Sequence, residues 1–410
     1  MRSAPVYYGW YVLAASAVSE MLVQGATSYA AGLFVLPLQA EFHVSRAVAN
    51  LPVLILFAGA MLIAPMVGRI LDAWPIRRVM PLGALLLALS FAGIAVAHSL
   101  AVMAVILFLP AAIAFMAAGP LNTSTLASRW FYRRRGLAQG LAAVATSAGG
   151  FIVVPLLSIG IQNHGWRPAL FCEGVIESVI IVALALLVLR DRPSDMGLQD
   201  HPENQGRLAN RATAQHLRWS GILFSRAFWI PCLTLAAISA TSQAIIITLV
   251  PYGVQLGMSP VAAAAPISVF AIVAAVTKVV AGLLADRVNQ RALLIVAALA
   301  MTICWLALTL FALPAALFTA AGLAGIALGC ALPTTAGLIA NHFGSARFGQ
   351  VMGWCYALTA ALLLSSVIFA GTMFDRTKSY HTPFLVFAVL LAVISLLVIM
   401  VAPGRETSAA

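Results

Sequence analysis

The chain carries a short charged stretch between two long apolar runs, Gly68-Arg69-Ile70-Leu71-Asp72-Ala73-Trp74-Pro75-Ile76-Arg77-Arg78. A second copy follows later in the sequence, as Gly282-Leu283-Leu284-Ala285-Asp286-Arg287-Val288-Asn289-Gln290-Arg291. Gly68 and Gly282 are 214 residues apart, and the same offset separates Asp72 from Asp286 and Arg77 from Arg291. Because the offset is constant at three positions, we infer that the chain contains two copies of one half.

The composition of the 410-residue chain excludes an ordinary soluble protein. It is 62% hydrophobic and only 9% charged, whereas soluble domains carry about 25% charged residues. The apolar residues form runs long enough to cross a hydrocarbon core, which takes about 20 residues. These runs lack the alternation of a membrane β-barrel. The composition therefore predicts an all-α polytopic membrane protein.

Twelve apolar runs predict twelve transmembrane helices in two pseudo-symmetric halves of six. The expected spans are 8–37, 47–71, 78–98, 100–128, 136–161, 167–189, 224–252, 261–285, 292–312, 315–341, 347–373 and 382–402. A polar stretch of mixed charge with proline and glycine separates the sixth run from the seventh, as is typical of a linker. The predicted organisation is an N-terminal half at 1–190, a cytoplasmic linker at 191–222 and a C-terminal half at 223–410.

The net charge of +11 is explained by lysines and arginines that gather in one alternate set of loops. Such loops stay in the cytoplasm, so we expect a multi-pass protein of the cell inner membrane with both termini cytoplasmic. This interpretation removes the reason to expect nucleic acid as a partner. The five cysteines lie in apolar runs without metal-ligand spacing. We expect a monomer that is not an enzyme and that has no metal and no cofactor.

The first charged stretch resembles the signature loop of the major facilitator superfamily, G-x-x-x-D-R/K-x-G-R-R/K-x. Gly68, Asp72, Arg77 and Arg78 match that pattern, whereas Ala73 replaces the basic residue that usually follows the aspartate. The resemblance implies the major facilitator fold, a transporter whose two halves rock around a substrate site near the middle of the membrane.

A narrower resemblance rests on short motifs in a fixed order: Tyr8-Gly9-Trp10, Trp130-Phe131-Tyr132-Arg133-Arg134-Arg135, Ala148-Gly149-Gly150, Gly165-Trp166-Arg167 and Arg192-Pro193. Together they resemble the monocarboxylate porter and oxalate/formate antiporter branch. Proton-coupled animal members of that branch pair an arginine in helix 8 with an aspartate one turn earlier. This chain has Lys278 and Ala274 at those positions, and no charged residue lies between Gln350 and Thr372 to supply a second cation.

Lys278 is the strongest candidate for a substrate-binding residue. An unpaired ammonium at the centre of a membrane helix costs about 2.5–3.5 kcal/mol on insertion scales, and an anionic substrate would offset this cost. The alternative is that Lys278 extends to the membrane surface, but Asp286 at the end of the run is eight residues away. That distance is roughly 12 Å of helix, beyond the reach of a lysine.

Further candidates are polar residues inside other apolar runs. Glu20 could carry a coupling proton, or it could be a protonated hydrogen-bonding group between helices. Four residues could line the substrate site through hydroxyl or amide groups, and core packing is the alternative for each of them: Tyr29, Asn122, Gln243 and Tyr356.

The two charged stretches are candidates for a conformational latch. An aspartate at the end of a helix can accept hydrogen bonds from the N-terminus of a neighbouring helix, where the helix dipole favours negative charge. In the superfamily that Gly68 to Arg78 resembles, this contact closes the cytoplasmic side. The predicted latch residues are Asp72, Arg77, Arg78, Asp286, Arg287 and Arg291. A simple turn-stabilising role for the aspartates is the alternative.

We therefore expect a secondary active transporter of a small organic anion, most simply a monocarboxylate, that works by alternating access. Proton symport is one coupling mode, and exchange or antiport is the other. The alternatives are an exporter of another small solute and a membrane sensor that does not transport. The partners expected from the sequence are the organic anion, protons and membrane lipids.

Overall fold

The computed structural model describes residues 7–49, 51–198 and 225–400, and every regular element among them is a helix. Twelve segments of this part of the chain are long and apolar enough to span a membrane. Most of their ends lie within three residues of the expected spans, so the predicted all-α polytopic fold is confirmed. Residues 199–222 of the predicted linker lie outside the described residues.

The first six spans form one bundle, which we call the N-half. Its spans are built from α1 (Gly9–Gln24), η1 (Gly25–Tyr29), η2 (Ala30–Phe34), α2 (Val35–Phe42), α4 (Leu51–Ala73), α5 (Ile76–Val96), α6 (Leu100–Ile106), η3 (Leu107–Ala111), α7 (Ala112–Ala118), α8 (Pro120–Trp130), α9 (Arg135–His164) and α10 (Trp166–Leu187). The short helices α3 (Arg46–Ala49) and η4 (Pro193–Met196) lie between or after the spans.

The last six spans form the second bundle, the C-half, and each is one continuous α-helix. They are α13 (Arg226–Gln255), α14 (Pro260–Ala285), α15 (Gln290–Leu310), α16 (Pro314–Phe343), α17 (Phe348–Thr377) and α18 (His381–Met400). The first two begin at a serine cap, because the hydroxyls of Ser225 and Ser259 accept hydrogen bonds from the backbone N–H groups of Phe228 and Ala262.

The first span continues beyond the predicted end at Pro37, which corrects the sequence-based boundary. It passes through a π-helical turn and a 3₁₀ turn, and a new α-helical segment then begins at Val35. Pro37 therefore lies in the first turn of α2, where its missing N–H needs no helical partner. The span ends at Phe42 because His43 adopts a left-handed conformation with φ of 51°.

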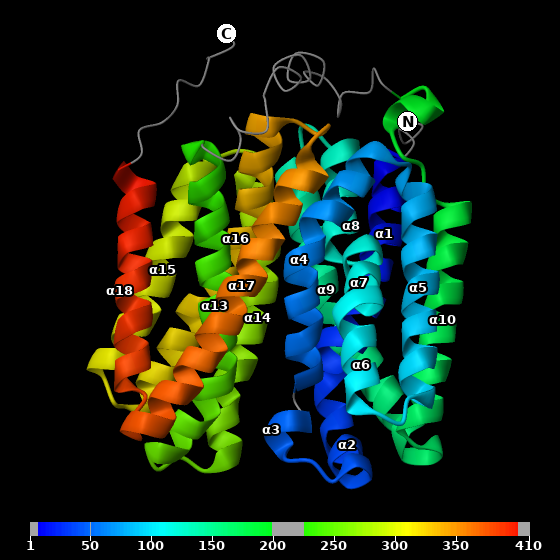
Figure 1. Ribbon diagram of the computed structural model, residues 1–410. Helices are drawn as coiled ribbons and strands as arrows, with labels where there is room; N and C mark the ends of the chain where they lie inside the picture. Colours follow the sequence, from blue (N-terminus) through cyan, green and yellow to red (C-terminus); the bar gives the residue numbers. More distant parts are fainter. Residues whose placement is uncertain (1–6, 50, 199–224, 401–410) are drawn as a thin grey trace, which may run out of the picture.

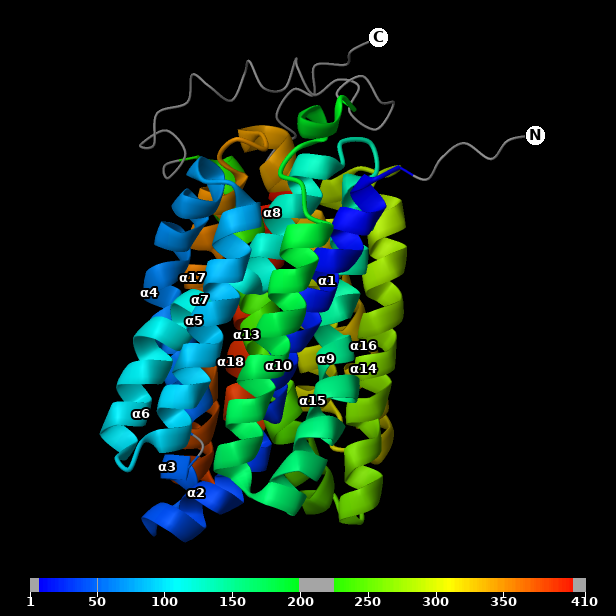
Figure 2. The same ribbon diagram turned by 90° about the vertical axis from the view of Figure 1, so that its right-hand side faces the viewer.

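The two bundles stand side by side and meet along a few helices (Figures 1 and 2). Helix α4 packs against α17, and α9 packs against α14 and α16. The start of α1 and the end of α18 lie on one face, which we call the terminal face, and α2 and α3 lie on the opposite face (Figure 1). This arrangement places the second and fifth spans of each half at the interface between the bundles.

Candidate functional site

A cavity of about 240 Å³ lies between the two halves. Both halves contribute to its wall, which is mostly apolar with a small number of polar groups, as is usual in small-molecule sites. The N-half supplies Glu20, Gln24, Tyr29, Phe57, Phe115, Met116, Pro120, Ala143 and Thr146, and the C-half supplies Leu235, Ser239, Lys278, Leu328, Leu332, Tyr356, Thr359, Ala360 and Leu363. We call this the central cavity.

Lys278 projects from α14 across the boundary between the halves. Its Nζ donates hydrogen bonds to the carbonyl oxygen of Ala143, at 2.9 Å, and to the hydroxyl of Ser147, at 2.8 Å, both on α9. The residue is 9% exposed. Among the described residues, no carboxylate forms an ion pair with it. The ammonium is therefore held by neutral oxygens at the wall of the central cavity.

Glu20 lies on α1 at the same wall and is 2% exposed. Its Oε1 accepts a hydrogen bond of 2.8 Å from the hydroxyl of Thr146. Thr146 belongs to the turn of α9 that also holds Lys278, so one turn of this helix bonds an acidic side chain of the N-half and a basic side chain of the C-half. The two charges are close enough to interact electrostatically without forming a direct ion pair.

The structure brings some of the other predicted site residues into the central cavity and leaves others outside it. Tyr29 and Tyr356 line the cavity, and the Tyr356 hydroxyl is buried. Asn122 on α8 is 1% exposed, and its amide has no partner among the described residues. Neither Asn122 nor Gln243 belongs to the cavity wall.

Several polar residues of the site were missed by the sequence analysis. Thr146, Ser147, Ser239 and Thr359 all lie at the cavity wall or at the Lys278 ammonium. Serine and threonine in a membrane helix commonly bond to the backbone of their own helix, as Thr359 does to the Cys355 carbonyl at 2.8 Å. The sequence therefore gave no signal that separated these hydroxyls from ordinary helical ones.

The two repeated aspartates join the halves near the terminal face. Asp72, at the end of α4, accepts hydrogen bonds from the backbone N–H groups of Gly349 at 2.9 Å and Gln350 at 2.8 Å, at the start of α17. Asp286, at the end of α14, accepts them from the corresponding N–H groups at the start of α9. Both carboxylates thus meet the positive end of a helix dipole in the opposite half.

The partners of Asp286 are Gly136, at 2.6 Å, and Leu137, at 2.9 Å. The glycine is required by close packing, because a Cβ atom at this position would lie 2.6 Å from the carbonyl oxygen of Gly282. A further hydrogen bond between the halves joins Arg135 Nη1 to the side-chain oxygen of Asn341 at 2.9 Å. The contacts of Asp72, Asp286 and Arg135 across this face thus involve backbone or uncharged partners.

The arginines of the repeated stretches act within each half. Arg77 Nη2 donates to the carbonyl oxygen of Leu186 at 2.9 Å, at the end of α10. Arg291 makes the equivalent contacts in the C-half, to the carbonyl oxygens of Val398 and Ile399 at the end of α18. Each guanidinium thus caps the last helix of its own half. Arg78 and Arg287 are exposed.

Arg129 is a buried residue of the terminal face whose position the sequence did not reveal. It is 5% exposed and donates a hydrogen bond to the carbonyl oxygen of Leu71, next to Asp72. The positive-inside interpretation treats it as one more loop arginine. Because Arg129 is buried beside Asp72, it places a positive charge next to the contact between Asp72 and α17.

The sequence of the chain is similar to those of known transporters. The chain is 29% identical over 268 residues to monocarboxylate transporter 11 of Mus musculus, covering 63% of this chain and 58% of the relative. It is 24% identical over 282 residues to monocarboxylate transporter 12 of the same species, with the same coverage. The chain thus spans less than two thirds of these relatives. An uncharacterized MFS-type transporter of Bacillus subtilis (strain 168), YcxA, is 25% identical over 195 residues, 47% of each chain.

Solved structures with the same fold include the human organic anion transporter MFSD10, with a TM-score of 0.74 and 16% identity, covering 97% of this chain and 100% of that one. The proton:xylose symporter XylE gives a TM-score of 0.73 at 17% identity, covering 97% and 96% of the two chains. The family model of the Major Facilitator Superfamily matches residues 17–314 and 232–410. The chain therefore belongs to the Major Facilitator Superfamily.

Proposed function

We propose that this protein transports a small organic anion, most simply a monocarboxylate, by alternating access. The observation that carries the proposal is the Lys278 ammonium, which lies at the wall of the central cavity and is bonded only to neutral oxygens among the described residues. A buried charge without a counter-ion is costly and marks a substrate pathway more often than a structural contact. The resemblance of the chain to monocarboxylate transporters agrees with an anionic substrate.

The number of charges in the cavity favours a single carboxylate. Lys278 is the one cationic residue in the wall of the central cavity as the described residues define it. A substrate with two carboxylates would leave one of them without a cationic partner, and a buried unpaired charge is strongly unfavourable. The apolar side chains around Lys278, such as Leu328 and Leu332, suit the hydrocarbon part of a small aliphatic or aromatic acid.

Glu20 is the proposed carrier of a coupling proton. An ionised Glu20 is attracted to the Lys278 ammonium, so it competes with the substrate carboxylate for this cation. Protonation of Glu20 removes the competing negative charge, so the substrate anion and the proton would enter together. The Thr146 hydroxyl keeps Glu20 in place in both protonation states, because it can donate to the carboxylate and accept from the acid.

The conformational cycle is proposed to depend on Asp72 and Asp286. Both carboxylates bond to helix N-termini across the interface, so these contacts must break for the terminal face to open. We place the protein in the cell inner membrane as a monomer. Its terminal face then points toward the cytoplasm. On this proposal the described state is closed toward the cytoplasm. The arginines Arg77 and Arg291 keep each half rigid while it moves.

Uptake into proteoliposomes tests the proposal. We expect the purified protein to take up a radiolabelled monocarboxylate from a panel of small acids, and the Lys278→Gln variant to lose this uptake while it inserts normally. Lys278→Arg should retain part of it, since the cation is preserved. Ser147→Ala is the matched control, because it removes one bond to the ammonium and leaves the charge. Full uptake by Lys278→Gln would refute the proposal.

The same liposomes distinguish the coupling modes. An inward proton gradient should accelerate net uptake into liposomes that contain no anion, if Glu20 couples a proton to the substrate. Uptake that occurs only into liposomes preloaded with an anion would indicate exchange. Absence of any carboxylate movement, with a well-folded protein, would favour another solute or a sensor.

A further inference from the structure

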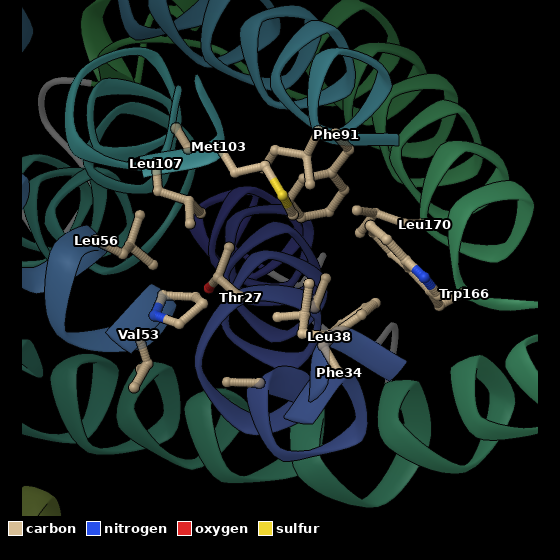
Figure 3. A pocket seen from close by; sticks show the side chains of 15 residues that line it. Thr27, Phe34, Leu38, Val53, Leu56, Phe91, Met103, Leu107, Trp166 and Leu170 are labelled. Atoms are coloured by element: carbon tan, nitrogen blue, oxygen red, sulfur yellow. The ribbon is translucent and has the colours of Figure 1, made fainter. Parts of the chain in front are cut away.

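A second cavity, of about 70 Å³, lies inside the N-half and is distinct from the central cavity. Figure 3 shows side chains from several helices arranged around it. Its wall is almost entirely apolar, with residues such as Phe91, Met103, Leu170 and Trp166. The one side-chain hydroxyl, that of Thr27, donates a hydrogen bond to its own helix at the Val23 carbonyl oxygen. Nothing in this wall selects a charged or strongly polar ligand.

The repeat explains why this cavity exists in the N-half. At the constant offset of 214 residues, Leu170 corresponds to Phe384 and Phe91 corresponds to Trp305. In the C-half these larger side chains pack against each other, with ring centroids 5.3 Å apart and at most 1% of either residue exposed. The N-half has smaller side chains at both positions, so the equivalent volume is not filled by the chain's own aromatic rings.

Two further positions of the wall follow the same trend. Leu38 corresponds to Tyr252, whose ring contacts Phe384 at a centroid distance of 5.2 Å. Ala31 corresponds to Ile245, which is 1% exposed. The difference is not uniform along the wall, because Phe34 and Leu107 are larger than Thr248 and Ala321 at the corresponding positions. The missing volume therefore lies in the part of the wall around Leu38, Phe91 and Leu170.

The cavity also lies where the N-half departs from α-helical geometry. The three irregular turns within the spans contribute to its wall: Ala26 and Thr27 from η1, Ala31 and Phe34 from η2, and Leu107 and Ala111 from η3. The equivalent helices of the C-half, α13 and α16, are continuous. Turns of π type inside helices occur frequently at functional sites.

The irregular segment of the first span connects this cavity to the central one. Tyr29, at the end of η1, lines the central cavity, whereas Ala26 and Thr27 of the same turn line the apolar cavity. The segment from Gly25 to Phe34 packs chiefly against α9 of the N-half. A molecule in the apolar cavity would therefore contact the backbone segment that positions Tyr29.

We propose that the apolar cavity is a second binding site, for a small uncharged hydrophobic molecule, and that a ligand bound there restrains the segment 25–34 of the first span. The size sets the ligand class: dry apolar protein cavities of about 150 Å³ bind benzene or xenon, so a cavity of about 70 Å³ suits a xenon atom or a short hydrocarbon. The inference does not depend on which solute the central cavity carries.

Xenon is the probe that tests this site, with helium at the same pressure as the control for pressure alone. Hydrogen–deuterium exchange of the peptide covering residues 25–34 reports on the segment directly. At a xenon concentration equal to its dissociation constant, exchange through local opening should slow by about twofold, because binding multiplies the closed population by 1 + [L]/Kd. The thermal unfolding midpoint should rise with xenon pressure.

Three variants make the test specific. Leu170→Phe and Ala31→Ile each introduce the residue found at the corresponding position of the C-half, and each should abolish the response of segment 25–34 to xenon. Two positions are used so that a folding defect in one variant leaves the other informative. Phe384→Leu, the reverse change in the C-half, should leave that response intact. The proposal would be overturned if xenon left the exchange rate of the wild-type segment unchanged. It would also be overturned if Leu170→Phe and Ala31→Ile both responded to xenon as strongly as the wild-type protein.

Discussion

Replacing Asp286 with asparagine should make the closed form of the terminal face less stable. The size of this change in free energy follows from the hydrogen bonds that the side chain accepts. The carboxylate accepts two backbone hydrogen bonds, from Gly136 and Leu137. Asparagine can accept one of them and presents an NH₂ group to the other N–H. A hydrogen bond to a charged group contributes about 1.5–3 kcal/mol, and a neutral one about 1 kcal/mol.

The variant thus loses one charged bond and converts the other to a neutral bond, which costs the closed state about 2–5 kcal/mol. That range corresponds to roughly a 30- to 4,000-fold change in the equilibrium between closed and open forms. If the halves move as rigid bodies, Asp72→Asn should shift the same equilibrium by a similar amount, since it also accepts two backbone N–H bonds. The double variant should then show the sum.

The assay is a distance distribution between spin labels on the two halves. Trp74 and Val288 are suitable positions, because they are 57% and 45% exposed and lie in corresponding turns after α4 and α14. The exposed Cys172 is replaced beforehand so that only the introduced cysteines are labelled. We expect the wild-type protein to give a short distance and Asp286→Asn to add a longer component.

Asp191→Asn is the matched control for this experiment. Asp191 accepts a backbone hydrogen bond of 3.0 Å from Arg77, in the same half of the molecule. Removing its charge changes a similar contact without touching the interface, so the distance distribution should stay that of the wild-type protein. An unchanged distribution in Asp286→Asn, Asp72→Asn and the double variant would refute the latch reasoning.

Three further predictions concern single side chains. Gly136→Ala should also open the terminal face, because its Cβ atom would lie 2.6 Å from the Gly282 carbonyl oxygen, whereas Gly32→Ala has no atom within 4 Å and should leave the spin-label distances unchanged. Arg291→Ala should lower the free energy of unfolding by about 2–3 kcal/mol through loss of its charged bonds to the end of α18, measured by thermal unfolding; an altered distance between the halves would contradict its assignment to one half. Glu20→Gln should make uptake insensitive to an inward proton gradient, since the amide cannot carry the proton, and a gradient response equal to that of the wild-type protein would exclude Glu20 as the coupling group.

The sequence predicted the architecture well because the membrane imposes a simple rule. Each span needs a long apolar run, and the repeated glycine, aspartate and arginine positions identified the two halves. The error at Pro37 has a physical cause. A proline ends a helix when it falls in the interior, but here a π turn and a 3₁₀ turn restart the helix, so that Pro37 lies in a first turn.

The sequence predicted the charged part of the site better than its neutral part. Lys278 was identifiable because an ammonium in an apolar run has a large energetic cost, and it does lie at the central cavity. Asn122 and Gln243 have polar side chains in equally apolar runs, yet they lie outside the cavity wall. A neutral side chain costs less to bury, so its presence in a run does not reveal which face of the helix it occupies.

The roles within the repeated stretches required three-dimensional contacts. The aspartates and arginines recur at the same offset, yet Asp286 bonds across the interface and Arg291 bonds within its own half. The constant offset shows which positions of the two halves correspond, but it does not show in which direction each side chain points. The apolar cavity was also beyond the sequence, because it depends on differences in volume between Leu170 and Phe384 that matter only once both are known to face a core.

The central claim is that Lys278 binds the carboxylate of the substrate. The most direct measurement compares the affinity of the purified protein for a small monocarboxylate with its affinity for the uncharged primary amide of the same carbon skeleton. A charge-assisted hydrogen bond of about 1.5–3 kcal/mol predicts that the wild-type protein prefers the carboxylate by roughly 10- to 150-fold, and that Lys278→Gln binds the two compounds about equally. If the preference for the carboxylate survived in Lys278→Gln, the anion would be bound elsewhere and the account of the site would be wrong.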